Sequence, residues 1–551
     1  MPLSIPRRCA ASYAFLVRLL SRAGLPVLTC LACCQVLGAC GGNAAQEDGA
    51  TPAQLGSVSG AASGGEQGGG DDSGAIGSGE ADDDNDDDDN DDDDNDDDDN
   101  DDNDDNDDDD DEDDDSAGPK FDVGAPEEGS DDGDTDCEES DKPTPTAFLE
   151  GVVYAPNGEL PISGALVYAV DGTFEVETIP DHVYCPECVE LPCEIHFVLT
   201  EPDGSFRLPT LAGDNQQLVV GKGQFLQISS VDIPEGDSNV GGDVTSLPDR
   251  RDPSQGMYIP NMAVGLGAYD RLEDALAKLG VADVAQSVMG ETLDPGTQQF
   301  DIWDNAGGGV IGGGPALDTL GPMQDLLTDR EKMDKYHIIF FPCTSADQLF
   351  ENATVVDNVR GWVADGGKLY AADWANEAVA KPFPQYQTFA TEAGSADLFS
   401  AYNTVGQVLD EDMLAWLNAL PDAFKDINPQ NAGGEVHPKM DDLPNVDLWH
   451  NWSVVLDTPS VEAEDEDGEM VEVGHYIWAE GTAPGMAGVD ANQVNPMTMT
   501  GQYGCGKLMF TTYHTAENIV YNGLAPQELV LMYLILEITV CTEGPSIIPP
   551  E

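Results

Sequence analysis

The sequence is poor in positively charged residues. Its 551 residues include 21 Lys and Arg against 107 Asp and Glu, which gives a formal net charge of −86. From residue 146 onward the imbalance persists, with 15 Lys and Arg against 63 Asp and Glu. Nucleic acids and anionic lipid surfaces attract proteins through Lys and Arg. We therefore expect no nucleic acid among the partners of this chain.

Apolar runs long enough to cross a bilayer are absent after the first 40 residues. The N-terminus has the pattern of a targeting segment, with Arg7 and Arg8 ahead of an apolar stretch over 25–39. The sequence Leu37-Gly38-Ala39-Cys40 resembles a bacterial lipobox, which implies cleavage before Cys40 and acylation of that residue. The alternative is an ordinary secretory signal. We predict a signal peptide over 1–39 and a lipid anchor in the cell envelope, on either face of the outer membrane.

Residues 40–145 lack the apolar residues that a folded core requires. A Gly/Ser-rich stretch comes first, and residues 82–115 then consist of 28 acidic residues and six Asn. Such a block repels itself and stays extended, so we predict a disordered tether. Weak calcium binding is an alternative, because Asp132, Asp134 and Asp136 alternate suitably, although Cys137 replaces the glycine of a calcium loop. An acidic export signal is a third possibility.

Cysteines are few in the part expected to fold. Five of the 12 lie at or before Cys40, and Cys185, Cys188 and Cys193 gather in a Pro-rich loop. Disulfides are the default in an exported protein. A Cys₃His zinc site, completed by His182 or His196, is the alternative. The seven cysteines after Cys40 form an odd set, so at least one thiol is unpaired or pairs between chains.

Residues 146–250 contain short apolar stretches separated by turn residues, which is typical of a small all-β sandwich. Asp203-Gly204 predicts a hairpin between the strands at 195–200 and 205–208. The stretch "GVVYAPNGELPISGALVYAVDG" is similar to carboxypeptidase regulatory-like domains, which implies a transthyretin-like sandwich. Domains of this kind are usually non-catalytic.

Residues 251–551 show the alternation of an α/β domain with a mostly parallel sheet. The clearest unit is a strand over 337–341, a helix ending at Gly366-Gly367, and a strand over 368–372. A strand, a helix and a strand in this order predict two parallel strands. Asp373 and Trp374 follow the second strand, where ligands of such sheets bind.

Three further features surround this unit. Asp270 and Glu273 have the spacing of a capping box before a short helix. The apolar stretch 529–540, opened by Pro526, predicts a buried helix. Residues 422–500 have no clear pattern, and we interpret them as an insertion near the carboxyl edge of the sheet.

The order of "YHIIFFPC", "VRGWVADGGKLYAADW" and "GKLMFTTYHTAE" resembles the flavodoxin-like class I glutamine amidotransferase-like fold, in its trehalose-utilisation-type branch, over about residues 258–541. The resemblance implies a Cys nucleophile on the turn after the strand at 368–372, and a His with an acidic partner after a late strand. His514 matches the His, and Glu517 lies one residue beyond the acidic position. Asp373 or Trp374 occupies the nucleophile position, so amidotransferase chemistry is not expected.

Three hypotheses about function follow. The first is a lipid-anchored protein with a non-catalytic α/β domain, a pseudoenzyme that binds an unknown ligand such as a glycan or a protein. The second is a Cys-His hydrolase or transferase that uses Cys343, His514 and Glu517. The third is carbohydrate binding through the rings of Trp374, Trp449 and Trp452. No cofactor is expected beyond the zinc and calcium alternatives.

Overall fold

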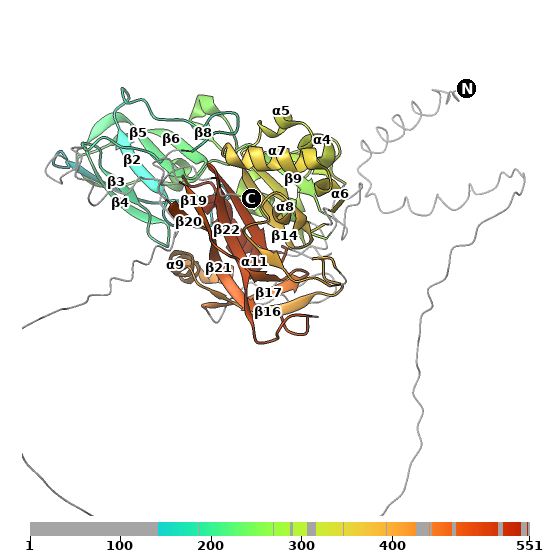
Figure 1. Cartoon of the computed structure of the whole chain (residues 1–551). Coiled ribbons are helices and arrows are strands. Elements are labelled where there is room, and N and C mark those ends of the chain that lie inside the picture. The colour runs from blue at the N-terminus through green and yellow to red at the C-terminus, as the bar shows by residue number, and fades with distance from the viewer. Residues whose placement is uncertain are drawn as a thin grey trace, which may run out of the picture. The chain divides into compact units, whose positions relative to one another are not determined.

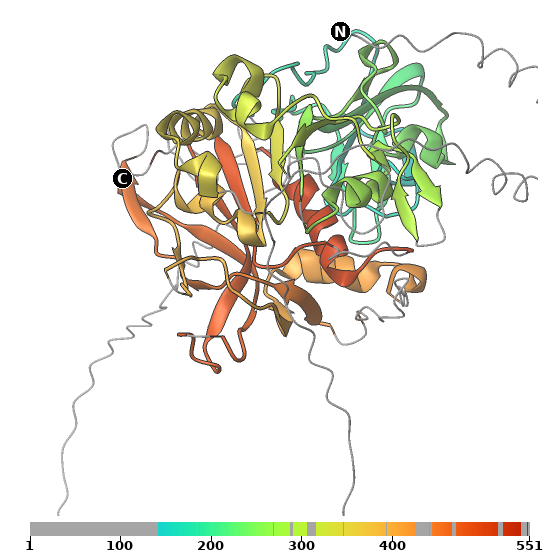
Figure 2. The same ribbon diagram turned by 90° about the vertical axis from the view of Figure 1, so that its right-hand side faces the viewer.

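The computed structural model (Figures 1 and 2) describes residues 142–551 except 187, 268, 287–289, 306–315, 345–346, 393, 426–439, 441–442, 465–469, 487, 516–521, 542–547 and 549–551. All of these described residues belong to one compact unit. The predictions for Cys40, for the tether and for Glu517 lie outside the described residues.

The first part of the described chain forms two sheets. One has the order β4 (Ser205–Thr210), β1 (Ala147–Val152) and β7 (Gly236–Asn239). The other has the order β3 (Phe197–Leu199), β2 (Leu166–Val170), β5 (Gly213–Lys222), β6 (Phe225–Ile233) and β8 (Met257–Tyr258). Side chains from both, among them Leu149, Leu208, Val167 and Val220, share one core. The transthyretin-like assignment stays a prediction.

The turn predicted between β3 and β4 forms, but the hairpin does not. The Gly204 N–H donates to the carbonyl of Glu201 over 2.8 Å, and Gly204 has φ +77°, which favours glycine. However, β3 pairs with β2, and β4 pairs with β1 in the other sheet. The hairpin prediction is therefore wrong, because a turn sequence specifies a reversal of the chain and leaves the pairing partner to the surrounding sheets.

The second part is built on a nine-stranded sheet. Its order is β12 (Asp301–Asp304), β9 (Met262–Leu266), β13 (Ile338–Phe341), β14 (Lys368–Ala372), β23 (Gly506–Thr511), β22 (Val494–Tyr503), β21 (His475–Thr482), β16 (Tyr402–Val408) and β17 (Asn445–Asn451). The pairs from β12 to β23 are parallel. The pairs from β23 to β17 are antiparallel.

The central strand–helix–strand prediction is confirmed. Strands β13 and β14 pair in parallel with Ile338 opposite Lys368, and α7 (Ala353–Ala364) connects them. The Asn352 side chain accepts the N–H of Thr354 at the start of α7, and Gly366, at φ +107°, follows its end.

Both faces of the parallel strands are covered, which explains their continuous apolar character. On β13, Ile339 and Phe341 face one cluster, which also holds side chains of α4 (Met323–Leu327), α5 (Arg330–Met333), α7 and α8 (Glu377–Ala380). Ile338 and Phe340 face the other, with α3 (Leu272–Leu276), α9 (Glu411–Ala419) and α11 (Pro526–Glu537). Further short elements are α2 (Gly242–Thr245), β10 (Val284–Gln286), β11 (Glu291–Leu293), α6 (Asp347–Phe350), β15 (Thr388–Phe389) and α10 (Asp422–Lys425).

Residues 422–500 are integrated in the main sheet, where they contribute β17, β21 and β22. They also form β18 (Val455–Asp457), β19 (Val461–Glu464) and β20 (Met470–Val473). The topology thus shows a clear pattern of strands in this segment, while its interpretation as an insertion stays a prediction. The strands in this segment mix buried and partly exposed residues, and that weaker pattern is harder to recognise than a continuous apolar run.

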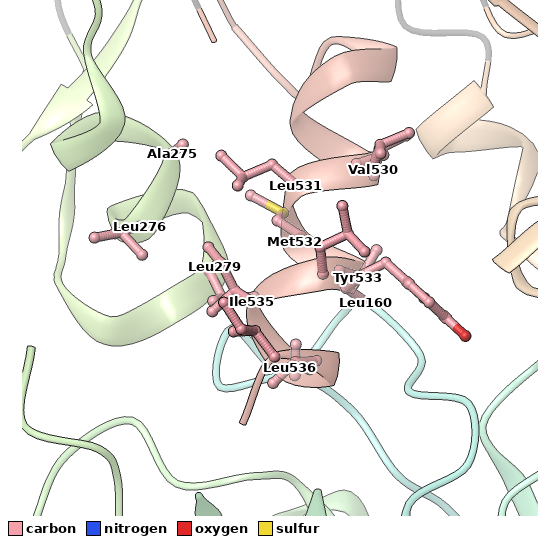
Figure 3. Close-up of a cluster of buried hydrophobic side chains, with 14 of the residues drawn as sticks. Leu160, Ala275, Leu276, Leu279, Val530, Leu531, Met532, Tyr533, Ile535 and Leu536 are labelled. Carbon is pink, nitrogen blue, oxygen red and sulfur yellow. The ribbon is translucent and has the colours of Figure 1, made fainter. Parts of the chain in front are cut away.

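Helix α11 is buried along its whole length, as its apolar sequence predicts. Figure 3 shows Leu276 and Leu279 beside this helix, and Leu160 of the first part belongs to the same cluster. Side chains from both parts of the chain thus share one core around α11. No helix among the described residues is long and apolar enough to cross a membrane.

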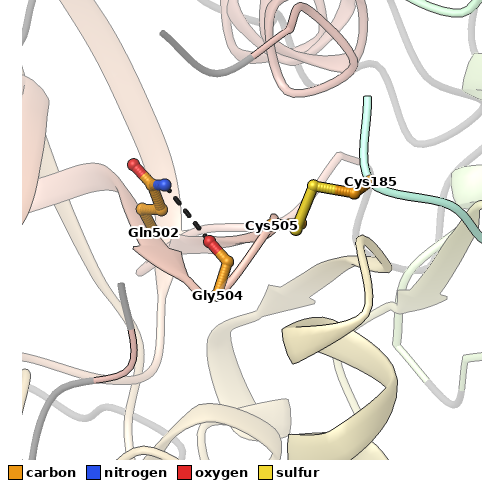
Figure 4. Close-up of a disulfide and its surroundings, with 4 residues drawn as sticks. All are labelled: Cys185, Gln502, Gly504 and Cys505. Atoms are coloured by element: carbon orange, nitrogen blue, oxygen red, sulfur yellow. Dashed lines mark hydrogen bonds between the residues drawn. A yellow bond between two sulfur atoms is a disulfide. The ribbon is translucent and has the colours of Figure 1, made fainter. Parts of the chain in front are cut away.

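Two disulfides hold the loop after β2. Cys185 bonds to Cys505 in the tight turn between β22 and β23 (Figure 4), and Cys188 bonds to Cys541 beyond α11. In the same turn, the Gln502 side chain donates to the carbonyl of Gly504 over 3.1 Å. Cys193 is also disulfide-bonded. The structure thus has disulfides at the three cysteines for which zinc was the alternative.

Candidate active site

Three side chains capable of chemistry meet at the carboxyl edge of the parallel sheet. Cys343 follows β13, Asp373 follows β14 and His514 follows β23. Because these strands are parallel neighbours, their ends lie at one edge, which is where such sheets carry their sites. The three side chains are at most 1% exposed.

Asp373 stands at the strained turn where the amidotransferase-like resemblance places a nucleophile. Its φ of +56° is in the left-handed region, directly after the extended residue Ala372 and at the start of a 3₁₀ turn. Asp tolerates this region better than most residues. The dihedral angle identifies Asp373, rather than Trp374, as the residue at the turn.

Both carboxylate oxygens of Asp373 are engaged. Oδ1 accepts the backbone N–H of Trp452 over 2.7 Å. Oδ2 lies 2.8 Å from Nδ1 of His514 and 3.7 Å from Sγ of Cys343. Asp373 is thus the shared contact of the other two side chains.

The acidic partner of His514 within the described residues is Asp373, which lies 141 positions away in the sequence. The sequence indicated His514 and placed Asp373 at a strand end, but it did not indicate that they bond. Glu517, the partner expected from the resemblance, is outside the described residues. Gln527 supports the arrangement, because its amide donates to the carbonyl of His514 while its Oε1 accepts the N–H of Trp449 over 3.1 Å.

Burial raises the pKa values of Asp373 and Cys343, which favours their protonated forms. Burial raises the pKa of Asp373 to about 6, although the hydrogen bond from His514 opposes the shift. Burial also raises the pKa of the Cys343 thiol well above its ordinary value, and the nearby charge of Asp373 raises it further. The thiol of Cys343 therefore remains protonated at neutral pH.

Asp270, which follows β9, accepts hydrogen bonds from backbone groups at the same edge of the sheet. Its Oδ1 accepts the N–H groups of Arg271 over 2.7 Å and Thr515 over 3.2 Å, and its Oδ2 accepts the N–H of Cys343 over 3.4 Å. Helix α3 starts at Leu272 without a side-chain cap. The capping box predicted from Asp270 and Glu273 is therefore wrong, because bonds from Cys343, after β13, and from Thr515, after β23, occupy the Asp270 carboxylate.

Aromatic rings surround this edge. The ring of Trp374 makes edge contacts with Tyr269 and Trp452, each with centroids 5.1 Å apart. Trp374, Trp449 and Trp452 are all half-buried. Trp374 therefore packs within an aromatic group, while Trp449 lies on β17 with its ring 6.2 Å from that of His450.

No protein-family model and no curated protein matches the chain. Among solved structures, it is similar to a ThuA-like protein from Bacteroides uniformis, with 10% identity, 52% of this chain and 94% of that chain covered, and a TM-score of 0.26. A cytoplasmic protein from Salmonella typhimurium gives 8% identity, 47% and 89% coverage, and a TM-score of 0.21. A GH42 β-galactosidase has 11% identity to this chain and a TM-score of 0.21, and the match covers 51% of this chain and 30% of the β-galactosidase chain. TM-scores of this size do not establish a shared fold.

Proposed function

We propose that this chain is a lipid-anchored protein of the cell envelope, and that its α/β part binds a ligand or has a structural role without catalysing a reaction. The observation that carries the proposal is Asp373 on the strained turn after β14. A cysteine nucleophile would stand at this position in an active amidotransferase-like enzyme. The ligand class that we propose is a glycan or a protein of the envelope.

The contacts of Asp373 support a positioning role for this residue. A carboxylate acting as a nucleophile or base needs an oxygen directed at the substrate. Here Oδ1 accepts the Trp452 N–H and Oδ2 faces His514 and Cys343. Asp373 therefore ties the end of β14 to the segment after β17 and to the segment after β23.

Cys343 is poorly suited to replace the missing nucleophile. A nucleophilic cysteine must be a thiolate at the working pH and must reach the substrate. Cys343 is 1% exposed, and its pKa is raised by burial. The Cys-His hydrolase or transferase is the alternative that these observations disfavour.

Alkylation of the native protein tests the absence of cysteine catalysis. We expect Cys343 to stay unmodified by iodoacetamide from about pH 6 to 9 in the full-length chain, and to react rapidly once the chain is unfolded in denaturant. Peptide mass spectrometry measures the extent of modification at each pH. A chelator in every sample ensures that a bound metal ion is not the cause of protection. Fast alkylation of native Cys343 near pH 7 would instead support the enzyme alternative.

Lipid labelling tests the anchor. Replacing Cys40 with Ala is expected to abolish incorporation of a radiolabelled fatty acid and to move the protein from the membrane fraction to the soluble fraction, because the acylated sulfur and amine both belong to Cys40. Cys34→Ala is the matched control, since it removes a nearby cysteine within the signal peptide and should keep the label. Retention of label by the Cys40→Ala variant would show that the chain is not anchored through this residue.

A further inference from the structure

Three atoms of the kind that ligate transition metals converge at the candidate site. Sγ of Cys343, a carboxylate oxygen of Asp373 and a ring nitrogen of His514 all lie within 4.8 Å of one another. They come from the ends of three neighbouring strands, β13, β14 and β23, so the sheet itself sets their separation. Sites placed on such rigid elements are better defined than sites on loops.

Each of the three residues is held by bonds outside the group. The Trp452 N–H binds Oδ1 of Asp373 and leaves Oδ2 directed at Cys343 and His514. The N–H of Cys343 is bonded to Asp270, and the carbonyl of His514 accepts from Gln527. Supporting bonds of this kind orient the ligands of metal sites and raise their affinity.

The donor set selects the class of ion. Thiolate sulfur and imidazole nitrogen suit zinc and similar transition-metal ions, whereas calcium and magnesium prefer oxygen ligands. A tetrahedral ion would take three protein ligands here and leave the fourth position for water. Binding would release the proton of the Cys343 thiol, because a cysteine ligates as its thiolate, whereas a neutral imidazole ligates through the ring nitrogen that carries no proton.

The state of the cysteines agrees with a ligand role for Cys343. Within the described part of the chain, Cys343 is the free cysteine, and it is buried. Cys185, Cys188, Cys193, Cys505 and Cys541 are disulfide-bonded. A thiol kept out of disulfides beside a carboxylate and an imidazole has the surroundings of a metal ligand.

We propose that Cys343, Asp373 and His514 bind a zinc-class divalent ion, which joins the ends of β13, β14 and β23. This proposal is independent of the function proposed above, since a domain without cysteine catalysis and an enzyme could each contain such an ion.

Cobalt(II) is the probe for this site, because its spectrum reports sulfur ligation. The acidic tract at 82–115 is expected to bind divalent ions weakly through oxygen, so metal content alone is not diagnostic. We expect the chelator-treated full-length protein to bind about one cobalt ion with a sulfur-to-cobalt charge-transfer band and the visible bands of tetrahedral coordination. Zinc should displace the cobalt and abolish both features.

Variants distinguish this site from other sites. Cys343→Ser should lose the charge-transfer band, and Asp373→Asn should weaken cobalt binding at this site by at least about tenfold. His475→Gln is the matched control, because His475 is a half-buried histidine that bonds to Gln387 over 2.9 Å, outside the group. The control should keep both the band and the affinity.

A second measurement uses the unsubstituted chain, so its result does not depend on whether the variants fold. Zinc should raise the unfolding temperature of the unsubstituted chain, because an ion that binds the native state stabilises it. The band and the stabilisation together would support the proposal. Cobalt binding without a sulfur band in the unsubstituted chain, or a band that persists in Cys343→Ser, would overturn it.

Discussion

Replacing Lys222 with Met is expected to destabilise the folded protein by about 3–5 kcal/mol. Nζ of Lys222 lies 2.5 Å from Oε1 of Glu537, and the two side chains are only 4% and 5% exposed. Lys222 ends β5 and Glu537 ends α11, so this ion pair joins the two parts of the chain. Its removal leaves a carboxylate buried without its cation, and that desolvation is the source of the large effect.

The measurement is the midpoint and slope of denaturant unfolding of the full-length protein. Two controls isolate the buried charge. The double variant Lys222→Met/Glu537→Leu should recover most of the loss, because both charges are then replaced by apolar groups. Lys332→Met removes a half-exposed pair with Asp329 and should cost at most about 1 kcal/mol. A loss in Lys222→Met no larger than in Lys332→Met would contradict the prediction.

Removing the Cys185–Cys505 disulfide should cost about 2–5 kcal/mol. The bond spans 320 residues of sequence, so without it the unfolded chain gains much conformational freedom. No helix or strand forms among the described residues of the loop between β2 and β3, so no strand or helix hydrogen bonds hold this segment in place. The loop does contact the α/β part, for example through the Val183 N–H, which donates to Asp334 over 2.8 Å.

Thermal unfolding of the Cys185→Ser/Cys505→Ser variant, with and without a reductant, tests this prediction. The variant should unfold at a lower temperature than the unsubstituted chain. A reductant should lower the unfolding temperature of the unsubstituted chain further, because it also breaks the Cys188–Cys541 bond. Cys343→Ser, measured in the presence of a chelator, is the control, as it removes a cysteine without removing a disulfide. A double variant as stable as this control would contradict the prediction.

The sequence was informative where local pattern determines structure. The continuous apolar run of β13, the helical spacing of α7 and the glycine after it predicted a parallel unit that the structure contains. The apolar character of α11 likewise predicted a buried helix. In both cases burial on two faces leaves a signal in consecutive residues, which a single sequence displays directly.

The candidate site was only partly accessible from sequence. The sequence placed Asp373 at a strand end, indicated Cys343 as a candidate nucleophile, and pointed to His514 through the resemblance. Their convergence on Oδ2 of Asp373 was not recognised, because it depends on β23 pairing with β14 across more than a hundred residues of intervening chain. The role predicted for Glu517 stays a prediction, because Glu517 lies outside the described residues.

In this protein the local sequence pattern therefore specifies individual helices and strands, whereas the pairing of distant strands brings the residues of the candidate site together. By itself the sequence determined the acidic character, the lipobox-like start, the repeat at 82–115 and the main buried strands and helices. Only the tertiary structure decided the partners of Cys185 and Cys188, the place of residues 422–500 in the sheet, and the bond between Asp373 and His514. The reason is physical: propensity and periodicity act over a few residues, whereas strand order and disulfide pairing join positions hundreds of residues apart.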